Sequence, residues 1–186
     1  SLKTSRIITR LAKFGTGPSA GWGTLDPAST PKIRLPKPGA TGLARGSGYL
    51  WAIAGPKTSF GIDDRVWLIE PATNEIVQTL HLGRQTTSID FGDGAAWIGA
   101  FASERKEKLY TSGVAGASWL FSVRTGAAGL RTRRYRLEKG DTAGPLAVSA
   151  GLAKVWVPTC GYCNRGFDNQ KLLEFDPAKW KVVHEI

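Results

Sequence analysis

The chain has 186 residues, 41% of them hydrophobic, which is enough to bury a core, and no run approaches the roughly 18 apolar residues of a membrane-spanning helix. The 23 glycines and 10 prolines are scattered between short apolar runs, a pattern that favours tight turns between strands over a disordered low-complexity chain. A net charge of +10 permits an anionic partner, but net charge reports on solubility rather than fold, so a solvated basic surface is the simpler interpretation.

The beginning of the chain has no clear repeat. Residues 1–19 are predicted to form an N-terminal extension, in which Arg6–Phe14 is compatible with a short strand or a basic amphipathic turn of helix. From residue 20 a repeat begins. Its first half-unit, residues 20–37, is predicted to be a hairpin over Trp22–Leu35 with its turn at Pro27–Pro31.

Three full units follow, over residues 38–83, 84–140 and 141–186, and each carries four short candidate strands bounded by Gly, Pro, Asp or Asn. Four antiparallel strands in a unit of roughly 40–60 residues are typical of a β-propeller blade. We therefore predict an all-β fold of about three four-stranded propeller blades and a hairpin. The predicted strands are Thr41–Ala44, Tyr49–Ala54, Val66–Glu70, Ile76–Leu82, Thr87–Phe91, Ala95–Ala100, Trp119–Val123, Leu130–Leu137, Leu146–Ala150, Lys154–Pro158, Leu172–Phe175 and Lys181–Ile186.

Tryptophans recur at matching places in these units. Trp51, Trp97 and Trp156 fall at equivalent positions of the second strands, and Trp67 and Trp119 are predicted to share a position in the third strands. Because a four-stranded meander cannot bury both of its faces by itself, we expect the large rings to pack between neighbouring blades.

The connections between second and third strands are long, at Gly55–Arg65, Phe101–Ser118 and Thr159–Lys171, whereas the other connections within a unit are short. In an up-and-down blade the long connections share one face with the crossings between blades. Because binding residues concentrate on loops that a rigid scaffold holds, we predict the contact surface there. The candidate binding residues are Lys57, Asp64, Arg65, Tyr110, Tyr162, Asn164, Arg165, Phe167 and Asp168.

The two cysteines form the motif Cys160-Gly-Tyr-Cys163. With no second pair and no nearby histidine, a structural zinc site is disfavoured, which leaves a local disulfide as the preferred interpretation and two free thiols as the alternative. A disulfide would indicate an oxidising compartment, so we expect an extracytoplasmic location, secreted or periplasmic. The sequence has no methionine, position 1 included, which favours a processed or excised segment over a full translation product.

Three phrases carry a resemblance to a known family: Gly-Ala-Ala-Trp97-Ile-Gly, the run from Val66 to Val77 that contains Glu-Pro-Ala-Thr-Asn, and the run from Leu172 to Val183 that contains Phe-Asp-Pro-Ala-Lys. The chain resembles the YVTN-type and virginiamycin-B-lyase-like β-propellers over about residues 20–186. The resemblance implies the fold more than an activity, because that superfamily includes lyases, lactonase-like enzymes, sensor ectodomains and interaction platforms.

The sequence contains few residue patterns that known catalytic mechanisms require. The lyase chemistry of the resembled family would need a histidine and metal-holding acids near the central channel, yet the only histidines, His81 and His184, fall on predicted outermost strands. Acidic loop residues such as Asp63, Asp64 and Asp168 suit a calcium or magnesium ion by type, but they lack the spacing of a calcium motif, so we expect no cofactor.

Three blades and a hairpin are too few to close a ring, so we expect the chain to belong to a larger propeller whose remaining blades come from the same or another chain. The predicted function is a non-catalytic module that binds a protein or carbohydrate. One alternative is a lyase- or lactonase-like enzyme with its catalytic residues mostly outside this chain. A second is a basic platform for nucleic acid or another polyanion, although strand alternation sends Arg131 and Arg133 to one face and Arg134 and Arg136 to the other.

Overall fold

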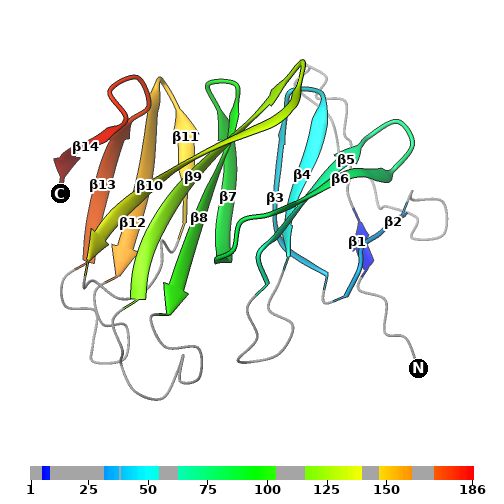
Figure 1. Cartoon of the computed structure of the whole chain (residues 1–186), viewed down its shortest axis with the longest axis horizontal. Helices are drawn as coiled ribbons and strands as arrows, with labels where there is room; N and C mark the ends of the chain where they lie inside the picture. Colours follow the sequence, from blue (N-terminus) through cyan, green and yellow to red (C-terminus); the bar gives the residue numbers. More distant parts are fainter. Residues whose placement is uncertain are drawn as a thin grey trace, which may run out of the picture.

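The computed structural model describes residues 6–8, 32–37, 39–54, 63–103, 116–139, 147–160 and 170–186. All the regular structure in these residues is β-strand, arranged in one two-stranded and three four-stranded antiparallel sheets (Figure 1). No helix in the described part of the chain is long and apolar enough to cross a membrane. The predicted all-β fold, with four strands in each of three units, is confirmed.

Each four-stranded sheet is a meander in which neighbouring strands follow one another in the chain. Short turns and long connections alternate between successive strands. The three sheets also follow one another in space in the order in which they occur in the chain. The first sheet contains β3 (Ala40–Gly46), β4 (Tyr49–Ala54), β5 (Arg65–Glu70) and β6 (Glu75–His81). The second contains β7 (Gln85–Gly92), β8 (Ala95–Ser103), β9 (Gly116–Gly126) and β10 (Gly129–Lys139), and the third contains β11 (Ser149–Gly151), β12 (Lys154–Cys160), β13 (Gln170–Asp176) and β14 (Lys181–Glu185).

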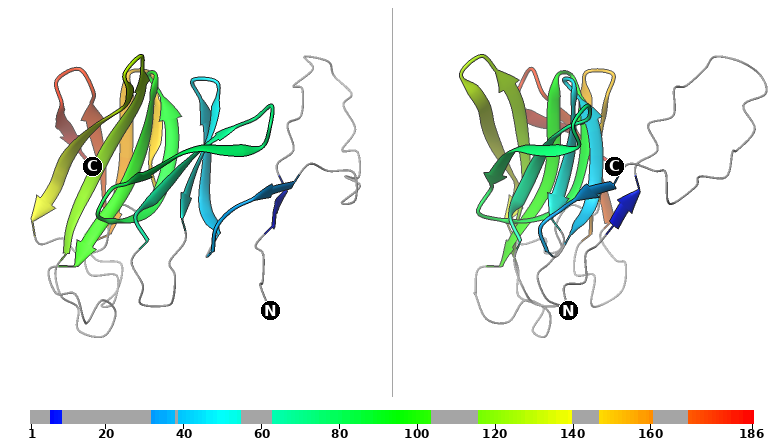
Figure 2. Two further views of the ribbon diagram at one scale, coloured as in Figure 1. Left: turned by 45° about the vertical axis from the view of Figure 1, so that its right-hand side comes forward. Right: turned by 90° about the vertical axis from the view of Figure 1, so that its right-hand side faces the viewer.

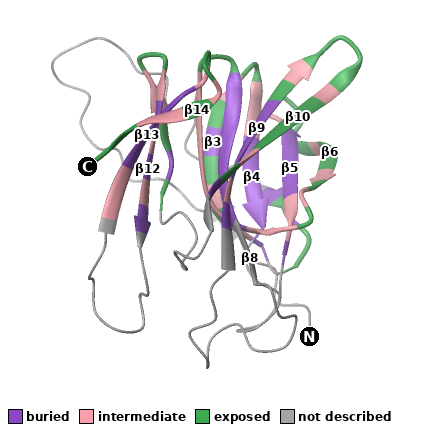
Figure 3. Ribbon diagram, turned by 60° about the vertical axis from the view of Figure 1, so that its left-hand side comes forward, coloured by how far each residue is buried: buried purple, intermediate pink, exposed green. Residues whose placement is uncertain are grey.

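The sheets stand face to face and come closest at their first strands (Figure 1, Figure 2). Gly46 at the end of β3 faces Phe91 of β7, and Gly92 at the end of β7 faces Ala150 of β11. A Cβ atom on Gly92 would lie 2.7 Å from the backbone of Ala150, so glycine permits this approach. Exposed residues gather on the outer strands β6 and β10 and in the hairpin turns (Figure 3).

Two of the predicted inter-sheet tryptophans form the core of these contacts. Trp51 and Trp97 are fully buried, and the indole N–H of each donates to the carbonyl of the glycine five residues earlier, Gly46 or Gly92, at 3.1 Å. Trp51 packs on Phe91 of the second sheet with ring centroids 6.2 Å apart, and Trp97 packs on Phe175 of the third at 5.8 Å. Both rings therefore point towards the following sheet.

Trp156 occupies the same place in β12, five residues after Gly151, but it is only partly buried. Its strand neighbours Val155 and Val157 pack against the second sheet, so alternation places Trp156 on the opposite face of the third sheet. No four-stranded sheet of the described residues follows the third, which is why this ring lacks the cover that Trp51 and Trp97 have. We call this surface the outer face of the third sheet.

The predicted equivalence of Trp67 and Trp119 is wrong. Trp51 pairs with Leu68 and Trp97 pairs with Ser122, so the register matches Trp67 to Phe121. The prediction aligned the predicted strands Val66–Glu70 and Trp119–Val123 at the tryptophan near the start of each. However, β9 continues to Gly126, and strand pairing sets the repeat. Trp119 instead occupies the place of Arg65.

The remaining strands, β1 (Arg6–Ile8) and β2 (Lys32–Arg34), pair antiparallel. The partner of β2 thus comes from the predicted N-terminal extension, and the predicted partner around Trp22 lies outside the described residues. Ile33 and Leu35 are buried against a cluster of the first sheet that includes Trp67 and Ile69. The segment around β2 therefore covers the face of the first sheet that points away from the second.

Candidate functional site

One end of the sheets carries both the long second-to-third-strand connections and the crossings between sheets. The Oγ1 of Thr86, near the start of β7, donates to the carbonyl of Ala54 at the end of β4 at 3.3 Å. The backbone N–H groups of Leu82 and Thr86 donate to the carbonyls of Asp64 and Asp63 at 3.0 and 3.3 Å. These bonds tie the β6–β7 crossing and the start of β7 to the end of β4 and the start of β5, and we call this end the long-loop face.

The opposite end consists of tight hairpin turns. Ser47 and Gly48, Asp93 and Gly94, and Leu152 and Ala153 all have positive φ. Positive φ at both central residues is what a type I′ turn requires, and this turn matches the twist of paired strands. Elaboration is therefore confined to one end of the described sheets, where the candidate site was predicted.

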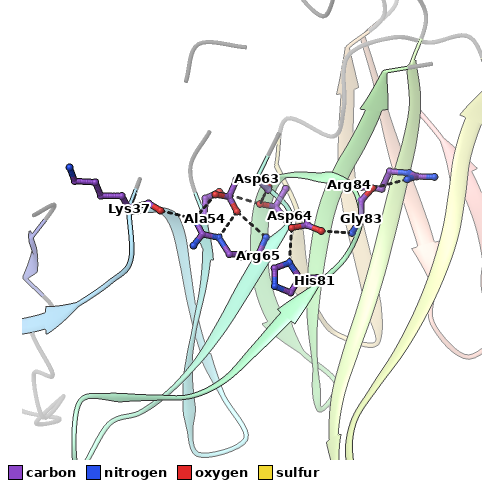
Figure 4. A network of polar contacts seen from close by, with 9 residues as sticks. Lys37, Ala54, Asp63, Asp64, Arg65, His81, Gly83 and Arg84 are labelled. Carbon is purple, nitrogen blue, oxygen red and sulfur yellow. Dashed lines mark hydrogen bonds and ion pairs between the residues drawn. The ribbon is translucent and has the colours of Figure 1, made fainter. Parts of the chain in front are cut away.

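Asp63 and Arg65 form a buried bidentate ion pair at the start of β5 (Figure 4). Arg65 donates from Nε at 2.8 Å and from Nη2 at 2.5 Å to the two carboxylate oxygens, and the Asp63 side chain is only 1% exposed. The hydrogen bond to Asp63 raises the pKa of Arg65, against the effect of burial. Arg65 also donates to the carbonyl of Lys37 at 2.7 Å and lies over the Trp67 ring, so it links the first sheet to the segment after β2.

Asp64 makes a second, more exposed set of contacts. Its Oδ1 lies 2.9 Å from Nδ1 of His81, and its Oδ2 accepts the Gly83 N–H at 2.9 Å (Figure 4). His81 ends the outermost strand β6, as expected, and its side chain is 64% exposed. Asp64 therefore holds the crossing that leads to Arg84, whose side chain points away from the Asp63–Arg65 pair in the same view.

The arginines of β10 divide between the two faces of the second sheet, as strand alternation indicated. Arg133 lies over Trp180 of the third sheet, with its guanidinium carbon 3.8 Å from the ring centroid. Arg134 and Arg136 lie on the other face, over Trp119, where Arg84 joins them. Sequence reasoning missed Arg84 and Trp119, because no local pattern signals a contact between a crossing and a strand of the next sheet.

A second polar cluster lies on the outer face of the third sheet. Lys154 bridges Glu174 at 3.0 Å and Asp176 at 3.3 Å, and His184, on the outermost strand β14, lies 2.8 Å from Glu174. Contacts with His184 and then Lys154 lower the pKa of Glu174. The backbone N–H of Lys179, reinforced by Lys154, lowers the pKa of Asp176 to about 2. Both carboxylates are thus held ionised beside Trp156.

Much of the predicted binding surface lies outside the described residues: Lys57, Tyr110, Tyr162, Asn164, Arg165, Phe167 and Asp168. Cys163 lies there too, and Cys160 is described only by its backbone at the end of β12, so the disulfide stays a prediction. The two predicted residues that are described, Asp64 and Arg65, lie next to each other but belong to separate contact sets. In the ranges given above, no three or more His, Cys, Asp or Glu side chains form a group that could hold a metal ion.

No protein-family model matches the chain, and no curated protein sequence matches it significantly. The resemblance of its repeats to the YVTN-type and virginiamycin-B-lyase-like propellers therefore remains a hypothesis.

Proposed function

We propose that this chain is a binding module built from propeller-type blades, with its contact surface on the long-loop face and a protein or carbohydrate as its ligand. One observation carries the proposal: the ends of β4, β8 and β12, from which the long connections leave, share an end with the β6–β7 crossing, whereas the hairpin turns at the other end are only two or four residues long. A rigid frame that lengthens loops at one end is the usual arrangement of a binding surface.

The polar contacts at this end support a rigid frame rather than a catalytic centre. The carboxylate of Asp63 is occupied by Arg65, and that of Asp64 by His81 and the Gly83 N–H. Both acids fix the backbone where the β4–β5 connection enters β5 and where the chain crosses from β6 to β7. A frame of this kind fixes where each loop starts and ends, which lowers the ordering cost of binding.

The proposal includes further blades. Trp51 and Trp97 each lie buried beneath the following sheet, and Trp156 has the same place in the third sheet without such cover. We infer that another four-stranded sheet, from the same or another chain, packs on the outer face of the third sheet in the larger assembly. Its first strand would approach Gly151 as β7 approaches Gly46 and β11 approaches Gly92.

The binding proposal is tested by screening the 186-residue chain against a glycan array and a displayed peptide library, and then measuring the affinity of variants for the ligand found. Tyr162→Ala and Arg165→Ala change the long-loop face. Arg124→Ala is the matched control, because Arg124 is exposed and lies beside the Gly94 turn at the opposite end. We expect the first two to weaken binding about tenfold or more and the control to leave it unchanged.

Other outcomes would contradict the proposal. Affinity that depends on Arg124 and not on Tyr162 or Arg165 would place the ligand at the wrong end. Affinity that falls steeply between low and physiological salt would favour a polyanion platform, because counterion release dominates such binding. Metal-dependent turnover of a lactone or cyclic ester would favour the enzyme alternative.

A further inference from the structure

Three arginine side chains converge on one tryptophan of the second sheet. The guanidinium carbons of Arg84, Arg134 and Arg136 lie 5.7, 5.4 and 5.9 Å from the ring centroid of Trp119. A guanidinium within about 6 Å of an indole centroid is attracted by the electron-rich face of the ring. Trp119 therefore gathers three positive charges at one place.

The strand geometry explains how the cluster forms. Arg136 is directly opposite Trp119 in the β9–β10 register, and Arg134 is opposite Phe121, so both side chains share the face of Trp119. Arg84 comes from the β6–β7 crossing, which Asp64 holds through Gly83. Since Trp119 lies near the start of β9, the cluster sits on the long-loop face and is built by the β6–β7 crossing and the second sheet together.

Two of these arginines, Arg84 and Arg134, have no ion pair among the described residues. The two aspartates that hold the β6–β7 crossing, on which Arg84 lies, have engaged carboxylates: Asp63 binds Arg65, and Asp64 binds His81 and Gly83. Within the described residues no carboxylate forms an ion pair with Arg84 or Arg134. Trp119 thus lies among three arginines, and two of them, Arg84 and Arg134, have no carboxylate partner among the described residues. A bound anion would stabilise this arrangement.

Buried hydrogen-bond donors at the cluster also favour a bound anion. The Nε of Arg84 and the Nε1 of Trp119 are both buried and have no hydrogen-bond acceptor among the described residues. The Nη1 of Arg84 already donates to the Gly83 carbonyl at 2.7 Å, which fixes the side chain. Buried N–H groups are nearly always paired in folded proteins, and an oxyanion offers several acceptor positions at once.

We propose that Arg84, Arg134 and Arg136, gathered around Trp119, bind a single oxyanionic group, a carboxylate or a phosphate, of a ligand at the long-loop face. The inference rests on the proposed function, because it assigns a charge to the ligand of that face. Arg133 takes no part, since it lies over Trp180 on the opposite side of β10. The site is therefore discrete and differs from a continuous basic stripe along β10.

The experiment titrates the 186-residue chain with sodium phosphate and, in a separate arm, with sodium acetate, with sodium chloride holding the ionic strength constant. Nuclear magnetic resonance follows the Trp119 indole N–H and the Arg84 Nε–H, which Trp119→Phe and Arg84→Lys variants assign. We expect both signals to shift in a saturable way. Saturation with phosphate alone, acetate alone or both supports the proposal and identifies the group that the site accepts.

Variants test which arginines bind the anion. Arg134 is exposed, and Arg134→Ala is expected to weaken the anion about tenfold or more through the loss of a charge-assisted hydrogen bond. Arg133→Ala removes the same charge from the other face of β10 and should leave the affinity unchanged. Arg84→Lys keeps the charge but removes the Nε donor, so it provides a second weakened variant with the net charge of the wild type.

Two results would overturn the inference: no saturable shift with either anion up to about 100 mM, or an equal loss of affinity in Arg133→Ala and Arg134→Ala. The proposed function fails separately. If the ligand found by screening still binds Arg134→Ala with full affinity and requires Tyr162 or Arg165, only the oxyanion site is rejected. If the anion binds as expected but the ligand binds at the opposite end, only the proposed contact surface is rejected.

Discussion

Asp63 is the described residue on which the geometry of the long-loop face depends most. Its side chain is 1% exposed, its carboxylate accepts three hydrogen bonds from Arg65, and its carbonyl accepts the N–H of Thr86 from the next sheet. A single residue thus fixes the start of β5 and connects it to the start of β7. A buried charge of this kind is tolerated only while its partner is present.

Replacing Asp63 by Asn should lower the free energy of unfolding by about 3 kcal/mol, because the nearly isosteric amide leaves the Arg65 charge without its counter-charge. Urea denaturation measures the loss. Asp64→Asn is the matched control, since Asp64 is 26% exposed and its contacts with His81 and Gly83 are solvated. Its expected cost is about 1 kcal/mol or less. Equal costs for the two variants would contradict the assignment of Asp63 as the buried anchor.

The lowered pKa of Asp176 predicts how the free energy of unfolding changes at acidic pH. Hydrogen bonds led by the Lys179 N–H lower its pKa from an ordinary value of 3.8 to about 2 in the folded protein. A carboxylate with a lowered pKa binds fewer protons folded than unfolded. Its stabilising contribution is therefore complete above about pH 4 and is lost as the pH falls towards about 2. Asp176→Asn should remove that dependence and keep the turn, because its side-chain oxygen can still accept from Lys179.

Urea denaturation of both proteins between about pH 7 and pH 2 measures this effect. The stability difference between wild type and Asp176→Asn should be largest at the upper end and should shrink below about pH 4. A difference that does not vary with pH would show that Asp176 stabilises the turn without its charge.

At the scale of the elements, the hairpin turns show how local chemistry and geometry can disagree. Asp93–Gly94 has the composition that a type I′ turn favours, whereas Leu152 and Ala153 adopt the same conformation at φ values of 52° and 57°. Leu152 is also 98% exposed, so no packing compensates for its backbone. The β11–β12 turn is therefore the strained one of the series.

The double variant Leu152→Asn with Ala153→Gly should raise the free energy of unfolding by about 1 to 2 kcal/mol, because asparagine and glycine tolerate positive φ. Thermal or urea denaturation would detect the gain. The reverse change in the second sheet, Asp93→Leu with Gly94→Ala, is the matched control and should destabilise the protein. No gain in the third sheet would mean that the turn is not type I′ in solution.

At the scale of the whole molecule, the equivalent glycines Gly92 and Gly151 distinguish a sheet face that a following sheet covers from one that no described sheet covers. Gly92 and Gly151 occupy equivalent places, but a Cβ on Gly92 would meet the Ala150 backbone, whereas one on Gly151 would meet no atom of the described residues within 4 Å. Gly92→Ala should cost about 2 kcal/mol through overpacking. Gly151→Ala should cost nothing in the isolated chain and can even stabilise it by reducing the freedom of the unfolded state.

The same pair tests whether another sheet packs on the outer face of the third sheet. The isolated chain, of 20.0 kDa, should associate in sedimentation experiments as its concentration rises, because no sheet of the described residues covers the face around Trp156. Gly151→Ala should weaken this association, since the added methyl would meet the backbone of the incoming strand. A monomer of constant mass at all concentrations would contradict the assembly.

The sequence by itself determined the all-β class, the four strands in each of three units, and the end of the sheets that carries the long connections. These features follow from local signals: short apolar runs, turn residues such as Asp93–Gly94, and the spacing between strands. Chain topology then places alternate connections at one end of a meander. The sequence also indicated that the arginines of β10 divide between the two faces of the sheet, because side chains alternate between faces along any strand.

Only the tertiary structure decided which residues meet. The register matched Trp67 to Phe121 instead of Trp119, and the stacking order left Trp156 partly exposed while it buried Trp51 and Trp97. The tertiary structure also brought Arg84, on the β6–β7 crossing, to Trp119 of the second sheet. The reason is physical: a strand's pattern reports which of its faces is apolar, whereas its partners come from segments tens of residues away, whose positions are fixed only when the sheets pack.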